Sequence, residues 1–243
     1  MGVSTVDLSV APARSRRSTG MLIGLGAFVI LAATQAYAIS ISAADRDMGH
    51  LQKIMYVHVP AAWNMMIAYF IVAIASLRYL WKGQEKDDLL AAAAAEAGAL
   101  MTGLALALGM IWGRPTWGIW WTWDARLTSA LITWLIYLGY LMLREGIKDP
   151  SERAKNSAVL SIFAFFAVYF TYKANEWYRT QHPGPVLTIR TGKNTIDPAM
   201  QAMLFHNLGA FLLLAVVLVA VRMNLENSQR AVESLRRRAH AIA

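Results

Sequence analysis

Six long apolar runs, separated by polar connections, recur along this chain. A helix needs about twenty mostly apolar residues to cross the hydrocarbon core of a bilayer, and the runs here are close to that length. We therefore predict an all-α polytopic membrane protein, with residues 1–243 forming a single membrane domain of six transmembrane helices. The predicted spans are 19–41, 60–81, 89–111, 127–143, 156–178 and 200–221.

The first run resembles a signal sequence, because Arg14, Arg16 and Arg17 precede it. It is longer than the apolar core of a signal peptide, so we interpret it as the first transmembrane helix. Six spans put both chain ends on one side, and most Lys and Arg residues of the connections lie on that side. Positively charged segments stay in the cytoplasm, so both termini, including the tail 222–243, are predicted to be cytoplasmic.

The composition excludes several classes of function. The chain has no cysteine, which rules out disulfides, thiolate metal ligands and thiol redox chemistry. Its net charge of +8 could indicate a nucleic-acid partner, but the basic residues flank the apolar runs and do not form a separate polar domain. We attribute this charge to membrane orientation.

The most unusual segment is 112–126, between the third and fourth spans. It contains five of the nine tryptophans, which are Trp112, Trp117, Trp120, Trp121 and Trp123. Indoles expose roughly 150–250 Å² each, so this group needs a flat apolar partner. If residues 116–124 are helical, three of these rings share one face with Asp124. We interpret the segment as an aromatic platform with a polar edge; a Trp belt at the membrane interface is the alternative.

Two histidines are predicted to lie on the same outer face as this platform. Pro60 fits best in a first helical turn, so His58 is expected just ahead of the second span. The segment 179–199 begins near His182, which Pro183 and Pro185 are expected to hold on a turn. Two imidazoles from separate segments and a floor of indoles are what a haem requires. His58 and His182 are therefore the predicted axial ligands of the haem iron.

The carboxylate edge of a haem needs cations. Arg126, just beyond the Trp segment, and Lys53, ahead of His58, are the predicted partners of the propionates. Asp124 is also expected to cap the first turn of the fourth span. Glu96 lies within the third span, and we expect it to reach the headgroups. His50, His206 and His240 receive no ligand role.

The run Trp-Gly-Arg-Pro-Thr-Trp-Gly-Ile-Trp-Trp-Thr-Trp-Asp-Ala-Arg-Leu-Thr-Ser closely resembles the "WWD" signature of haem-handling proteins. Together with Tyr-Val-His-Val-Pro-Ala-Ala around His58, and with His182, it makes the chain similar to the haem exporter protein C family, also called cytochrome c maturation protein C. The likeness covers nearly the whole length. The family pattern leads us to expect a basic residue ahead of the first ligand, and this chain has Lys53 there. A lysine ammonium is a point charge and lacks the planar, two-point geometry of an arginine guanidinium.

The resemblance implies a subunit of the bacterial inner membrane that works beside an ABC-type ATPase subunit, an ABC membrane subunit and a small single-span subunit, maturation protein D. Such a subunit holds haem b as cargo at the periplasmic surface and passes it to the haem chaperone, cytochrome c maturation protein E. His58 and His182 are then the iron ligands, and Trp112 to Asp124 form the haem platform. We expect a delivery subunit and not an enzyme, with a part in attaching haem to the chaperone left open.

Two other classes of function stay open. A b-type haem subunit for electron transfer would also use two histidines, but such proteins usually bury them within spans, where only His206 lies. A solute permease would need polar groups along a central pathway, and the spans are strongly apolar.

Overall fold

The computed structural model describes residues 13–182, 184 and 197–242, and within them the regular elements are all helical. The elements are α1 (Ala13–Ile41), the 3-10 helix η1 (His50–Ile54), α2 (Met55–Lys82), α3 (Glu85–Trp117), α4 (Ala125–Gly146), α5 (Pro150–Trp177) and α6 (Pro198–Ile242). Six of them are long and apolar enough to cross a membrane, which confirms the predicted fold class. Most extend beyond the apolar spans expected from the sequence.

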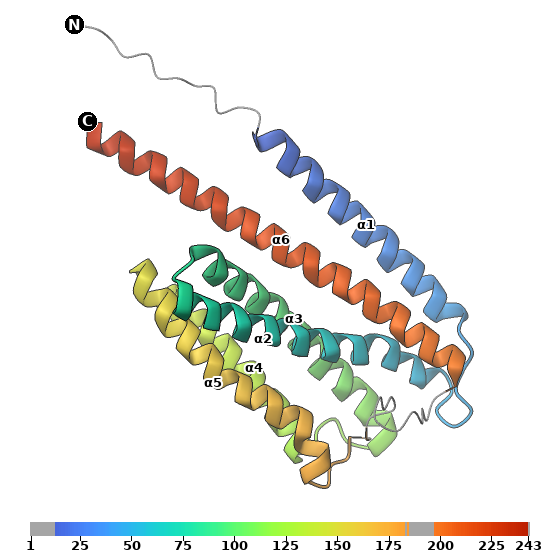
Figure 1. Cartoon of the computed structure of the whole chain (residues 1–243). Coiled ribbons are helices and arrows are strands. Elements are labelled where there is room, and N and C mark those ends of the chain that lie inside the picture. Colours follow the sequence, from blue (N-terminus) through green and yellow to red (C-terminus); the bar gives the residue numbers. More distant parts are fainter. Residues whose placement is uncertain (1–12, 183, 185–196, 243) are drawn as a thin grey trace, which may run out of the picture.

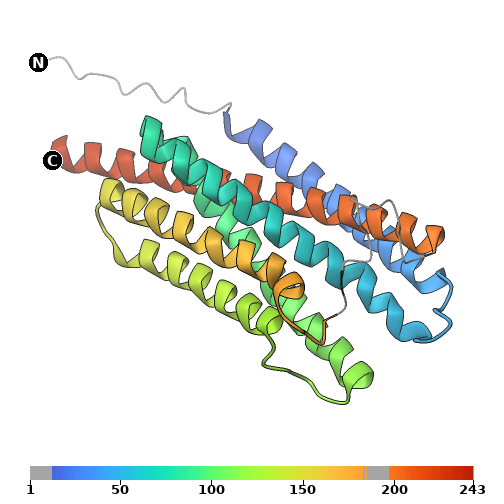
Figure 2. The ribbon, with the colours of Figure 1, turned by 60° about the horizontal axis from the view of Figure 1, so that its bottom comes forward.

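The helices pack in successive layers. α2 and α3 pack closely together, α4 and α5 cover one side of this pair, and α6 covers another. α1 packs on α6 at the outside of the bundle, and α6 reaches past the other helices toward its C-terminal end (Figure 1). The beginning of α1 and the end of α6 lie at the same end of the molecule, as both views show (Figures 1 and 2).

We name the two ends of the bundle by what they carry. The terminal end has the start of α1, the end of α6 and the turns at 83–84 and 147–149. The loop end has the segments 42–54, 118–124 and 178–182. The segments that carry or adjoin the predicted site residues therefore meet at the loop end.

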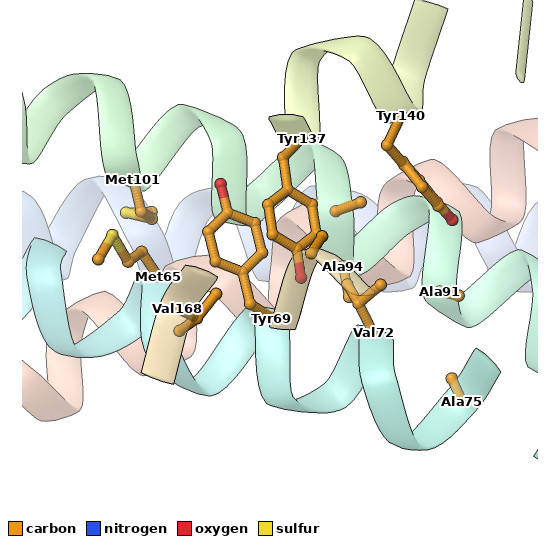
Figure 3. Packing of buried hydrophobic residues seen from close by; sticks show 12 residues of the cluster. Met65, Tyr69, Val72, Ala75, Ala91, Ala94, Met101, Tyr137, Tyr140 and Val168 are labelled. Atoms are coloured by element: carbon orange, nitrogen blue, oxygen red, sulfur yellow. The ribbon is translucent and has the colours of Figure 1, made fainter. Parts of the chain in front are cut away.

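An aromatic stack joins three helices in the middle of the bundle (Figure 3). The rings of Tyr69 from α2 and Tyr137 from α4 lie with centroids 3.5 Å apart and planes 9° apart. A Cβ at Gly98 of α3 would lie 2.5 Å from the Tyr69 ring, so only glycine fits there. The Tyr69 hydroxyl and the Thr102 hydroxyl are hydrogen-bonded at 2.8 Å. This core fixes α2, α3 and α4 relative to one another.

The prediction that His58 lies ahead of the second span is wrong. η1 runs directly into α2, so His58 lies in the first turn of α2 and Pro60 lies inside the helix. The reason is burial: Met55 and Tyr56 pack against Leu204 of α6, and this packing extends the helix back into a stretch that looked polar. Tertiary contacts thus placed His58 on a rigid helix.

Candidate functional site

A cavity of about 460 Å³ opens at the loop end, a size typical of small-molecule sites. α2 contributes one face, with Met55, His58, Ala62 and Met65 spaced three and four residues apart. The rest of the lining comes from α3, the start of α4, Thr171 of α5 and the loop-end segments 42–54, 118–124 and 178–182, and it is largely apolar. The cavity thus brings together segments that are far apart in the sequence.

His58 is held in one orientation by α3. Its Nδ1 donates a hydrogen bond to the carbonyl of Ala105 at 2.9 Å, which leaves Nε2 without a proton in the neutral ring. Gly109 allows this approach, because a Cβ there would lie 3.2 Å from His58 Cε1. The Trp112 ring stands edge-on to the imidazole, with centroids 5.9 Å apart.

His182, in the 178–182 segment, lines the same cavity as His58. The His58 and His182 ring centroids lie 6.3 Å apart, with planes 35° apart. The His182 carbonyl accepts hydrogen bonds from Thr180 Oγ1 at 3.2 Å and from Asn175 Nδ2 at 3.5 Å. The end of α5 therefore positions the backbone that carries this imidazole. Pro183 and Pro185, which were expected to form its turn, lie outside the described residues.

Asp124 connects the Trp segment to the His182 segment. Its Oδ1 accepts the backbone N–H groups of Arg126 and Leu127, both at 2.9 Å, so Asp124 caps α4 as the sequence predicted. Its Oδ2 accepts the backbone N–H of Gln181 at 3.0 Å. One carboxylate therefore anchors the start of α4 and the residue before His182.

Arg126 and Lys53, the two cations predicted to pair with the haem propionates, differ in their position relative to the cavity. Arg126, in the first turn of α4, lines the cavity. Lys53 is not among the lining residues, and its Nζ donates to the carbonyl of Ser40 at 3.0 Å. The structure therefore brings one of the two cations to the cavity wall.

Comparison with known proteins decides the family. A family model described as "Heme exporter protein C" matches residues 10–238. A Heme exporter protein C of Bradyrhizobium diazoefficiens is 39% identical over 209 residues, which cover 86% of this chain and 79% of the relative. The chain belongs to the haem exporter protein C family.

Two further members show the same extent of likeness. The Heme exporter protein C of Haemophilus influenzae is 36% identical over 219 residues, covering 88% of each chain. That of Escherichia coli K12 is 32% identical over 202 residues, covering 83% of this chain and 80% of the relative. The family model, which matches residues 10–238, spans the membrane helices and the loop-end cavity alike.

The five tryptophans of the WWD segment do not form one helical face. α3 ends at Trp117 because Gly118 adopts a left-handed conformation, with φ 79°, and its N–H bonds back to Arg114. Residues 118–124 are non-helical, so the helical reading of 116–124 is wrong. Trp112, Trp117 and Trp121 line the cavity, whereas Trp120 and Trp123 are 54% and 77% exposed.

Several lining residues were not identified from the sequence. Four methionines, Met48, Met55, Met65 and Met110, contribute adaptable apolar surface, and Thr171 and Gln181 add polar groups. The helical spacing of Met55 and Met65 with His58 was a usable signal. Thr171 carried none, because it lies inside an apolar run and reaches the cavity only through the packing of α5.

Proposed function

We propose that this protein is the haem-binding subunit of a cytochrome c maturation system in the bacterial inner membrane. It holds haem at the periplasmic face with His58 and His182 as axial ligands and delivers it to the haem chaperone, cytochrome c maturation protein E. The observation that carries the proposal is the approach of two imidazoles, from α2 and from the 178–182 segment, across one cavity with indole walls.

The spacing of the two rings supports a shared iron. Imidazole nitrogens bind metal ions at about 2 Å, so two axial rings on one metal have centroids about 6 Å apart. The observed separation of 6.3 Å is in this range. The hydrogen bond from His58 Nδ1 to Ala105 selects the tautomer whose Nε2 can bind iron. The site is thus organised before haem arrives.

The cavity walls suit haem b, bound non-covalently as cargo. Trp112, Trp117 and Trp121 offer aromatic surface to the porphyrin. Arg126 is the proposed partner of a propionate, because a guanidinium forms strong charge-assisted bonds with carboxylates. Lys53 is the second candidate, and it would have to exchange the Ser40 carbonyl for a propionate.

The exposed part of the WWD segment supports delivery. Trp120 and Trp123 lie on the outside of the loop end, where a partner protein can cover them. We propose this edge as the docking surface of the chaperone, and that the chain acts as a delivery subunit beside the ABC-type ATPase and membrane subunits and maturation protein D. Its part in the transfer is to present the haem.

Absorption spectra of the purified protein with added haem test the proposal. His58→Ala and His182→Ala are each expected to lose the six-coordinate spectrum of the wild type while still inserting into membranes. His50→Ala is the matched control, since His50 is on η1 and is not among the residues that line the cavity. An unchanged spectrum in both single variants would refute the ligand pair. Reversible reduction by a quinol would instead favour the electron-transfer subunit.

A further inference from the structure

A second cavity, of about 300 Å³, lies at the terminal end of the bundle, far from the histidines. Ala92 and Ala93 of α3 line it, with residues of α4 and α6 on either side. α3 packs against both of these helices, whereas α4 and α6 have little or no contact in the described part of the chain. Figure 1 shows the same separation of α6 from α4. The cavity is therefore a recess over α3, between α4 and α6.

Most charges of this recess neutralise one another. Arg222 Nε contacts both carboxylate oxygens of Glu96, at 2.7 and 2.8 Å, and its Nη1 contacts Glu226 at 3.1 Å. This pair gives Glu96 a partner that the sequence analysis did not identify. Arg144 forms a two-point ion pair with the buried Asp88, at 2.6 and 2.9 Å. The carboxylates and guanidinium groups in these pairs therefore need no partner from outside the protein. They are those of Glu96, Arg222, Glu226, Asp88 and Arg144.

Two opposite charges remain in the lining, Arg153 and Glu145. Within the described residues, neither side chain forms an ion pair or side-chain hydrogen bond, and Arg153 Nε is buried without an acceptor. A buried guanidinium nitrogen without a partner costs free energy, so such groups normally have a ligand or ordered water. The recess is thus lined by one cation and one anion that are not paired with each other.

The two unpaired groups lie at helix ends, where the headgroups of a bilayer are expected. Glu145 lies in the last turn of α4 and Arg153 in the first turn of α5. Leu89, Leu141 and Met223 line the same recess and provide apolar surface. A ligand here is expected to have a charged part at the helix ends and an apolar part along the helices.

We propose that this recess binds a phospholipid with a zwitterionic headgroup that carries a primary ammonium group, such as phosphatidylethanolamine. The phosphate pairs with Arg153, the ammonium pairs with Glu145, and an acyl chain lies between α4 and α6. Charged pockets between transmembrane helices are known to bind lipid headgroups, and Arg binds phosphate well. The proposal does not depend on haem binding.

The charge balance selects this headgroup over others. Arg144, Arg153 and Arg222 are balanced in the lining by Glu96, Glu145 and Glu226. The anionic headgroup of phosphatidylglycerol would satisfy Arg153 but carries no cation to pair with Glu145. A choline headgroup carries no N–H to donate to the carboxylate. Of these three headgroups, only that of phosphatidylethanolamine can pair with both Arg153 and Glu145.

Native mass spectrometry of the full chain, with lipids of matched acyl chains, tests the proposal. The wild type is expected to retain phosphatidylethanolamine several-fold better than phosphatidylglycerol or phosphatidylcholine. Arg153→Gln should abolish this preference, and Arg153→Lys should keep part of it. Lys148→Gln is the control, because Lys148 is a nearby exposed cation outside the recess.

Glu145→Gln tests directly whether the carboxylate selects the lipid headgroup. Glu145 is exposed, so its replacement is not expected to disturb folding. Without the carboxylate the recess becomes an anion site, and the preference should shift from phosphatidylethanolamine toward phosphatidylglycerol. Equal retention of the three lipids by the wild type, or an unchanged preference in both Arg153→Gln and Glu145→Gln, would overturn the proposal.

Discussion

Asp124 Oδ2 accepts the backbone N–H of Gln181 at 3.0 Å, while Oδ1 of the same carboxylate caps α4. The carboxylate of the WWD segment therefore holds the backbone next to His182. This contact explains how a loop residue can affect a ligand that lies in another segment.

Asp124→Ala is expected to remove the α4 cap, at a cost of about 1 kcal/mol, and to release Gln181. With its backbone less restrained, His182 should bind iron incompletely, and the spectrum should show a five-coordinate fraction. Asp124→Asn should be milder, because asparagine also caps helices. Thermal unfolding and absorption spectra measure the two effects.

Asp149→Ala is the matched control, because Asp149 caps α5 at the terminal end through the N–H of Glu152. It should lower the stability of the protein by a similar amount and leave the haem spectrum unchanged. If Asp149→Ala altered the spectrum as strongly as Asp124→Ala, the effect would come from general destabilisation.

Gly109→Ala is expected to displace His58. The new Cβ would lie 3.2 Å from His58 Cε1, so the ring must shift away from its hydrogen bond to Ala105. Overpacking of this kind costs about 1–3 kcal/mol, and haem binding should weaken accordingly. Haem titration measures the loss. Gly139→Ala in α4 is the control, because a Cβ there meets no atom within 4 Å and affinity should stay the same.

Arg126→Gln is expected to weaken haem binding without changing the axial ligands. Loss of one charge-assisted hydrogen bond costs about 1.5–3 kcal/mol, roughly 10- to 100-fold in affinity. The six-coordinate spectrum should persist at saturating haem. Lys173→Gln, which removes a partly exposed cation paired with Glu176, should bind haem like the wild type. Equal affinities of Arg126→Gln and the wild type would exclude the propionate contact.

Removal of the hydroxyl from each of the two stacked tyrosines is expected to change the free energy of unfolding differently. The Tyr69 hydroxyl bonds to Thr102, so Tyr69→Phe should lower the free energy of unfolding by about 1 kcal/mol. The Tyr137 hydroxyl is buried without a partner among the described residues, so Tyr137→Phe should be neutral or stabilising. Thermal unfolding in detergent compares the two. Greater destabilisation by Tyr137→Phe would indicate a buried water at that hydroxyl.

The sequence predicted correctly those structural features that depend on residues close together in the chain. The apolar runs predicted six long helices, and an aspartate ahead of an apolar run predicted the cap at Asp124. The prediction failed at 116–124, where three helically spaced tryptophans suggested a helix. Gly118 ends α3 instead, because a left-handed residue satisfies the last carbonyls of a helix at low cost for glycine.

By itself, the sequence determined that this chain folds as membrane helices and that its unusual tryptophans and two histidines belong to one end of the bundle, since these follow from hydrophobic length and loop order. The tertiary structure decided which of those groups meet. It put His58 on a helix through burial of Met55 and Tyr56, turned Trp120 and Trp123 outward, and kept Lys53 off the cavity wall. The physical reason is that packing between α2, α3 and α6 depends on contacts between distant residues, which no local pattern contains.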